Sequence, residues 1–495
     1  MPDEPKKHEE EKKETKPEPK DNLVATQHVV IIGGQEIKYT VTAGTMVMKE
    51  ETTDREKASE GEKAKAAFFF VAYIKDEVDD KAWRPLTFSF NGGPGSSSVW
   101  LHLGLLGPRR VVMSPEGMMP PPPFHLTQNG FSLLDRTDLV FIDPVSTGYS
   151  RPVEGQKARE FHDFNKDIET VGDFIRLYTT RNQRWTSPKF LIGESYGTTR
   201  AAALSGYLQE RHGMYLNGII LISSILDFQT AHFGPGNDLP YTLFLPTYAA
   251  TAWYHGKART RKSLPAFLKE VEYFATNEYT LALGKGARLT RRERNEMAAR
   301  VANFSGLTED YVRRANLRIE IFRFTKELLR DQQRTTGRLD TRFNGIDRDA
   351  AGESPEFDPS LAAITGPYTA TLYDYVRGEL KFESDLPYEV LNYKVWPWSF
   401  AQHENQYVNV AETLRRAMSI NPHLKVHVAN GYYDLATPYL ATRYTFDHLS
   451  LDPSLQRNLT MSYYEAGHMM YIHTPSLARL KEILAKFISD SKPAE

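Results

Sequence analysis

The 495-residue sequence contains no cysteine. Disulfide bonds, cysteine-ligated zinc and a thiol nucleophile are therefore excluded as sources of stability or chemistry. The formal net charge is only −2 at pH 7, which predicts neither a nucleic-acid partner nor binding to an acidic membrane. The chain also has no run of 18 or more apolar residues, so the sequence predicts no membrane-spanning helix.

The start of the chain has little that could be buried. Residues 1–20 are almost all charged residues and proline, and we expect residues 1–26 to be disordered. They lack the apolar segment of a signal peptide. The absence of cysteine is more typical of a bacterial protein than of a eukaryotic secreted one. We expect a periplasmic or secreted protein rather than a cytoplasmic one, with any signal peptide outside this numbering.

Short apolar runs alternate with helical patterns in two parts of the chain. A hairpin is expected around Gly33 and Gly34. Buried strands are expected at 66–74, 86–90, 138–143, 189–192, 218–222 and 425–429. Helical spacing covers residues 164–178 and 477–487. This alternation predicts an α/β protein with a mostly parallel central sheet flanked by helices.

The middle of the chain has a different pattern. Strand signals fade from about 231 to 395 and charged helical patterns replace them, including a capping box from Thr290 to Glu293. We therefore predict a core formed by residues 27–230 and 396–490, with a helical cap inserted at 231–395.

A serine stands between two glycines in Gly193-Glu194-Ser195-Tyr196-Gly197, which fits the pattern G-x-S-x-G. The pattern alone is weak, but an apolar strand precedes it and an alanine-rich helix follows. A serine on such a strand–turn–helix bend is typical of a nucleophile elbow. The alternative is an ordinary connection with a helix-capping serine.

A nucleophilic serine needs a base, and the base needs an orienting acid. In this topology the acid follows a later strand and the histidine comes last. Asp434 follows the strand at 425–429, and His468 lies in the loop after the next strand. The order therefore predicts Ser195, Asp434 and His468 as nucleophile, acid and base. His473 and Asp227 are the main competing candidates.

A glycine-rich turn follows the strand at 86–90 in the sequence "NGGPGSSS". Its free backbone N–H groups are candidates for stabilising an oxyanion. Together with "GESYG", "NGYYDLATP" and "EAGHMMY", in this order and spacing, the chain resembles the serine carboxypeptidases of peptidase family S10, which are α/β hydrolases with a helical insertion.

The resemblance implies further roles at matching positions. The backbone N–H groups of Gly93 and Tyr196 would form the oxyanion hole, and Asn91 and Glu194 would bind the terminal carboxylate of a peptide. It implies peptide substrates, no metal and no cofactor. Because a carboxyl group donates a hydrogen bond only when protonated, we expect better peptide binding at mildly acidic pH.

The sequence departs from the family pattern at several positions. Where the family has a tryptophan before the asparagine, this chain has Ser89, and serines 96–98 replace a Cys-Ser-Ser sequence. Leu105 stands where a family glutamate pairs with the one before the nucleophile. Thr198, Tyr432 and Tyr471 also differ from the family pattern. These changes leave the predicted triad intact and suggest a divergent bacterial-type member.

Two alternatives to a carboxypeptidase remain. The same triad could serve an esterase or acyltransferase, or the chain could be a non-enzymatic binding module on a hydrolase fold. The sequence leaves the preferred residues and the oligomeric state open, with a homodimer as one option.

Overall fold

The computed structural model describes residues 18–53 and 59–492. The predicted hairpin is confirmed: β1 (Asn22–Ile32) pairs antiparallel with β2 (Gln35–Thr53) across Gly33 and Gly34. The predicted tail is therefore too long, because residues 22–26 already pair with residues 41–45 of β2. Residues 1–17 lie outside the described residues, so the disorder expected there stays a prediction.

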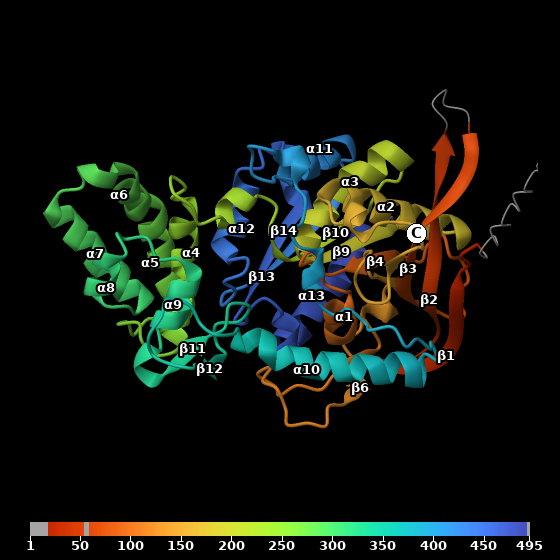
Figure 1. Cartoon of the computed structure of the whole chain (residues 1–495), viewed down its shortest axis with the longest axis horizontal. Helices are drawn as coiled ribbons and strands as arrows, with labels where there is room; N and C mark the ends of the chain where they lie inside the picture. The colour runs from red at the N-terminus through yellow and green to blue at the C-terminus, as the bar shows by residue number, and fades with distance from the viewer. Residues whose placement is uncertain (1–17, 54–58, 493–495) are drawn as a thin grey trace, which may run out of the picture.

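A ten-stranded sheet forms the centre of the described chain (Figure 1). Its strand order is β1-β2-β3-β7-β4-β9-β10-β13-β14, with β8 (Arg151–Pro152) paired to β3. The first strands are antiparallel, and all pairs from β7 to β14 are parallel, which confirms the predicted sheet. The remaining strands of this sheet are β3 (Ser59–Lys75), β4 (Leu86–Phe90), β7 (Asp138–Ile142), β9 (Lys189–Ser195), β10 (Gly218–Ser224), β13 (Lys425–Gly431) and β14 (Leu459–Tyr464).

Helices cover both faces of the sheet, as expected for central strands made almost entirely of buried residues. One face packs against α2 (Phe164–Arg181), α3 (Tyr196–His212) and α11 (Ala411–Ile420). The opposite face packs against α1 (Val99–Leu101), α10 (Pro359–Asp374) and α13 (Thr474–Ser491), as Figure 1 shows. None of the helices in the described residues is long and apolar enough to span a bilayer.

The segment after β10 is mainly helical and has a hydrophobic cluster of its own. The predicted capping box is present: the Thr290 side chain accepts from the backbone of Glu293 and Glu293 reaches back. The cluster also includes residues of α12 (Tyr439–Asp447). The helices of the segment are α4 (Leu239–Tyr254), α5 (Leu264–Phe274), α6 (Thr280–Lys285), α7 (Arg291–Ser305), α8 (Glu309–Arg314) and α9 (Ile321–Glu327).

The far end of this segment returns to the sheet. Within this segment, the short strands β11 (Arg334–Thr336) and β12 (Asn344–Ile346) pair with each other. Another pair of short strands, β5 (Arg109–Val111) and β6 (Leu126–Gln128), lies earlier in the chain. The next helix, α10, buries Tyr368 and Leu372 in the core beside the sheet rather than in the helical cluster. The division into a core and an inserted cap stays a proposal. Helix α10 falls within the predicted cap range 231–395 but packs on the core.

Candidate active site

Ser195 occupies a tight bend between β9 and α3. Ser195 is the last residue of β9 and precedes α3, with φ 60° and ψ −130°. Glycines on both sides allow this bend. A Cβ atom on Gly193 would lie 2.1 Å from the carbonyl oxygen of Gly197, and one on Gly197 would lie 2.8 Å from that of Phe90. The bend therefore holds Ser195 at the carboxyl end of a central parallel strand.

His468 and Asp434 form a buried pair at the same end of the sheet. His468 Nδ1 lies 2.7 Å from Asp434 Oδ2. The backbone of His468 is fixed on both sides. The N–H of His468 donates to the carbonyl of Leu339, and the carbonyl of His468 accepts from the Ser223 hydroxyl. With Nδ1 occupied by the carboxylate, Nε2 is the ring nitrogen left for a substrate or nucleophile.

Thr437 contacts both members of this pair and was not identified from the sequence. Its hydroxyl donates to Asp434 Oδ2 at 2.7 Å and lies 3.3 Å from His468 Nδ1. Backbone N–H groups of Ala436 and Thr437 donate to the other carboxylate oxygen, at 2.7 and 3.0 Å. These donors fix the orientation of the carboxylate.

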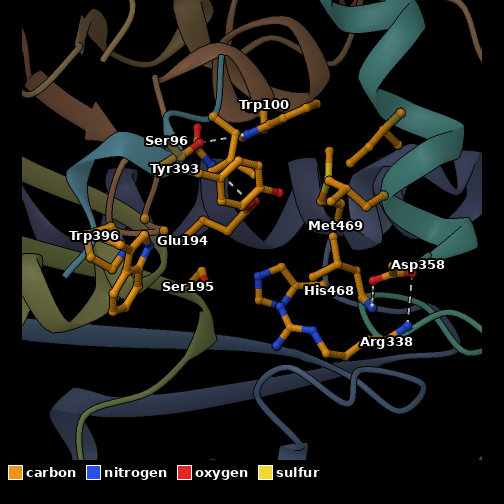
Figure 2. Close-up of a pocket in the computed structure, with 18 residues that line it drawn as sticks. Ser96, Trp100, Glu194, Ser195, Arg338, Asp358, Tyr393, Trp396, His468 and Met469 are labelled. Carbon is orange, nitrogen blue, oxygen red and sulfur yellow. Dashed lines mark hydrogen bonds between the residues drawn. The ribbon is translucent and has the colours of Figure 1, made fainter. Parts of the chain in front are cut away.

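Ser195 and His468 line one pocket of about 270 Å³. Figure 2 shows the imidazole of His468 extending from its backbone toward Ser195. The structure thus brings all three predicted triad residues to one place, with Asp434 behind the histidine. The pocket is also lined by Trp100, Leu361, Ile364, Leu391, Tyr393, Trp396 and Met469.

The glycine-rich turn after β4 lies against the elbow. A Cβ atom on Gly92 would be 2.4 Å from the backbone nitrogen of Tyr196, so only glycine permits this approach. Gly93 has φ +102° and lines the pocket. The turn therefore lies against the backbone nitrogen of Tyr196, and Gly93 lines the same pocket as Ser195. The N–H groups of Gly93 and Tyr196 stay the predicted oxyanion donors.

Asn91 and Glu194 are joined by a hydrogen bond inside this pocket. Asn91 Nδ2 donates to Glu194 Oε1 at 2.9 Å, and Asn91 Oδ1 accepts from the backbone of Leu101. The carbonyl of Asn91 accepts from Arg200, which forms a buried ion pair with Asp167. The amide is thus held from several sides, with Glu194 only 3% exposed.

The loss of the family glutamate at Leu105 does not leave Glu194 with a single partner. Tyr471, the residue in place of the family proline, donates its hydroxyl to Glu194 Oε2 at 2.6 Å. Room for its ring exists because a Cβ atom on Gly104 would lie 2.5 Å from Tyr471 Cε2. Leu105 itself is fully buried in the core. The phenol therefore supplies a hydrogen bond to this carboxyl group.

Burial sets the protonation of the two titratable groups around Ser195. Burial raises the pKa of Glu194 to about 7, and the charge of His468 and the hydrogen bond from Tyr471 limit that rise. Burial lowers the pKa of His468, but the charge and hydrogen bond of Asp434 act in the opposite direction and raise it above 6.5 overall. Glu194 therefore carries a proton over much of the range below neutral pH.

The competing candidates lie elsewhere. His473 precedes α13 and its Nδ1 contacts the hydroxyl of Ser476. Asp227 accepts a hydrogen bond from the backbone of Gln229 in a short turn. Neither lines the pocket that contains Ser195.

Backbone pairing connects the turn to residues 390–392, although the chain lacks the family cysteine. The N–H of Ser97 donates to Val390, and the N–H of Asn392 donates to Gly95. Ser96 Oγ accepts from Trp100 Nε1 at 2.8 Å, which fixes that ring in the pocket wall.

A serine elbow at the end of a parallel strand, in a sheet with helices on both faces, defines an α/β hydrolase. The sequence profile described as serine carboxypeptidase matches residues 58–481. The chain therefore belongs to the serine carboxypeptidase family.

Similar proteins agree with this assignment. Pheromone-processing carboxypeptidase KEX1 of Saccharomyces cerevisiae strain S288c is 30% identical over 161 residues, which are 31% of this chain and 20% of that protein. The match thus spans about a fifth of the length of this curated relative. The crystal structure of KEX1(delta)p, a prohormone-processing carboxypeptidase from Saccharomyces cerevisiae, is 18% identical with a TM-score of 0.54, over 91% of each chain. This likeness confirms the fold.

Proposed function

We propose that this protein is a serine carboxypeptidase that releases C-terminal amino acids from peptides through an acyl-enzyme on Ser195. Ser195 Oγ attacks the carbonyl carbon of the last peptide bond while His468 Nε2 accepts its proton. Asp434 stabilises the resulting imidazolium through the 2.7 Å contact with Nδ1. The N–H groups of Gly93 and Tyr196 donate to the oxyanion of the tetrahedral intermediate.

The intermediate then collapses toward products. His468 gives its proton to the leaving amine, the C–N bond breaks, and the shortened peptide remains as an ester on Ser195. A water molecule, deprotonated by His468, attacks this ester and restores the free serine. The scheme uses only these groups and water.

The observation that carries the proposal is the buried carboxyl group of Glu194, which is hydrogen-bonded to the Asn91 side-chain amide and lies next to the nucleophile. A neutral Glu194 can donate a hydrogen bond to the terminal carboxylate of a peptide, and Asn91 adds an amide beside it. Burial raises the pKa of Glu194 to about 7, so the donating form is well populated at neutral and acidic pH. Hydrolysis of an ordinary ester needs no such group.

The test compares one peptide with a free C-terminus and the same peptide as its C-terminal amide. Products of wild type and Ser195→Ala are read by mass spectrometry. We expect stepwise loss of residues from the free peptide, about a hundredfold lower kcat/KM on the amide, and no products with Ser195→Ala. Ser205→Ala is a matched control, because Ser205 lies on the same helix α3 and donates to Ala202 outside the pocket.

Other outcomes point to the alternatives. Equal rates on the free peptide and the amide, with fast hydrolysis or transfer of simple esters, would indicate an esterase or acyltransferase. Failure of Ser195 to react with a fluorophosphonate, in protein whose thermal unfolding is cooperative, would indicate a non-enzymatic binding module.

A further inference from the structure

The proposed mechanism makes no use of Arg338, the one lysine or arginine among the described residues that line the active-site pocket. This residue is half-buried and follows β11. Figure 2 shows its guanidinium beside the imidazole of His468, with Glu194 on the other side of that ring in this view. A permanent positive charge therefore lies next to the proposed base.

The guanidinium of Arg338 has no acidic partner among the residues that the structure describes. Across residues 18–53 and 59–492, it takes part in no ion pair and no side-chain hydrogen bond. The nearby Arg342 is different, because its Nη2 pairs with Asp340 Oδ2 at 2.6 Å. A half-buried arginine that lines a pocket and has no carboxylate partner can bind a carboxylate group of a ligand.

The acid nearest to Arg338 in the pocket wall has other partners. Asp358 accepts the backbone N–H groups of Arg338 and Leu339, at 3.1 and 3.4 Å, and that of Ser360 at 2.9 Å. It thereby caps α10 and fixes the main chain at Arg338. The carbonyl of Arg338 accepts from the N–H of Leu435. The arginine is thus placed by the scaffold, while its guanidinium is left for the pocket.

Burial and, to a smaller extent, the charge of Arg338 lower the pKa of His468, whereas Asp434 raises it. The charge of Arg338 disfavours the imidazolium form of His468. A substrate carboxylate bound to the guanidinium would remove that repulsion at the moment when the imidazolium forms.

We propose that Arg338 binds a side-chain carboxylate of the substrate, so that this enzyme prefers peptides with Asp or Glu at one of the two positions flanking the scissile bond. The proposal rests on the proposed function, which assigns the terminal carboxylate to Asn91 and Glu194. Arg338 then takes a second carboxylate, and the preferred substrate class is acidic peptides.

The experiment measures kcat/KM for peptide pairs that differ only by Glu against Gln at each flanking position. In wild type we expect the Glu peptide of one pair to be favoured by roughly tenfold, and Arg338→Gln to abolish that ratio. Because the ratio is formed within each variant, it does not depend on the fraction of active protein. Arg334→Gln removes a nearby charge outside the pocket and should keep the wild-type ratio.

A charge reversal and a binding assay complete the test. Arg338→Glu should favour a Lys peptide over the matched Glu peptide. In the Ser195→Ala background, the Glu peptide should bind roughly tenfold more tightly than the Gln peptide, and Arg338→Gln should remove this difference. Equal wild-type kcat/KM for every Glu and Gln pair would overturn the proposal for Arg338 and leave the carboxypeptidase activity standing. A wild-type enzyme that cleaves no peptide would instead overturn the proposed function.

Discussion

Replacing Tyr471 by phenylalanine tests how Glu194 recognises a terminal carboxylate. The substitution removes the hydroxyl that donates to Glu194 Oε2 at 2.6 Å and keeps the ring beside Gly104. A hydrogen bond to a charged, buried group contributes about 1.5–3 kcal/mol. Because that bond favours the ionised carboxylate, its loss raises the pKa of Glu194.

The magnitude and the sign follow from this energy. One pKa unit corresponds to about 1.4 kcal/mol, so the pH dependence of binding should move upward by about one to two pH units. In wild type, the affinity for a free-carboxyl peptide should fall as the pH rises through about 7, because ionised Glu194 repels the peptide carboxylate. In Tyr471→Phe, tight binding should persist to a correspondingly higher pH.

The assay is peptide binding by calorimetry or fluorescence anisotropy between pH 5 and 9, in the Ser195→Ala background so that no turnover occurs. The C-terminal amide of the same peptide serves as the ligand control, since it has no carboxylate to be repelled. Glu194→Gln serves as the protein control, because a glutamine donates at every pH and should give the same profile whether residue 471 is tyrosine or phenylalanine.

A downward displacement of the profile in Tyr471→Phe would refute the reasoning, as would an unchanged profile. An equal displacement for the amide ligand would show that another group titrates. A displacement that persists when Glu194→Gln is combined with Tyr471→Phe would also show that the hydroxyl acts elsewhere.

Two further substitutions test the geometry of the elbow and of the acid–base pair. Thr437→Val removes the 2.7 Å donor to Asp434 and should lower kcat about tenfold with little change in KM, measured on a neutral peptide; a change confined to KM would contradict a positioning role. Gly193→Ala places a Cβ atom 2.1 Å from Gly197 O and should destabilise the fold by about 3 kcal/mol or more, seen as a lower Tm, whereas Gly284→Ala, with nothing within 4 Å, should not. An unaltered Tm in Gly193→Ala would mean that the elbow tolerates a side chain.

The sequence by itself predicted the central sheet and the placement of the triad candidates. Short apolar runs bounded by turns are a local signal, and β4, β9, β10 and β13 begin where that signal begins. The elbow at Ser195 is also local, because it depends on two glycines within two positions of the serine. The order of Ser195, Asp434 and His468 is informative because the carboxyl ends of parallel strands meet at one edge of a sheet.

Only the tertiary structure showed that Tyr471, Thr437 and Arg338 belong to the surroundings of the site. Tyr471 contacts Glu194 from a segment far away in the chain, and Arg338 lines the pocket with no acidic partner among the described residues; no periodicity or spacing encodes such features. Thr437 lies only three positions from Asp434, but its contact with both Asp434 and His468 is seen only in the folded chain. The same holds for α10, whose helical pattern does not state which surface it covers; the structure packs it on the core. Local propensity decides which elements form, whereas packing in three dimensions decides which side chains surround the serine.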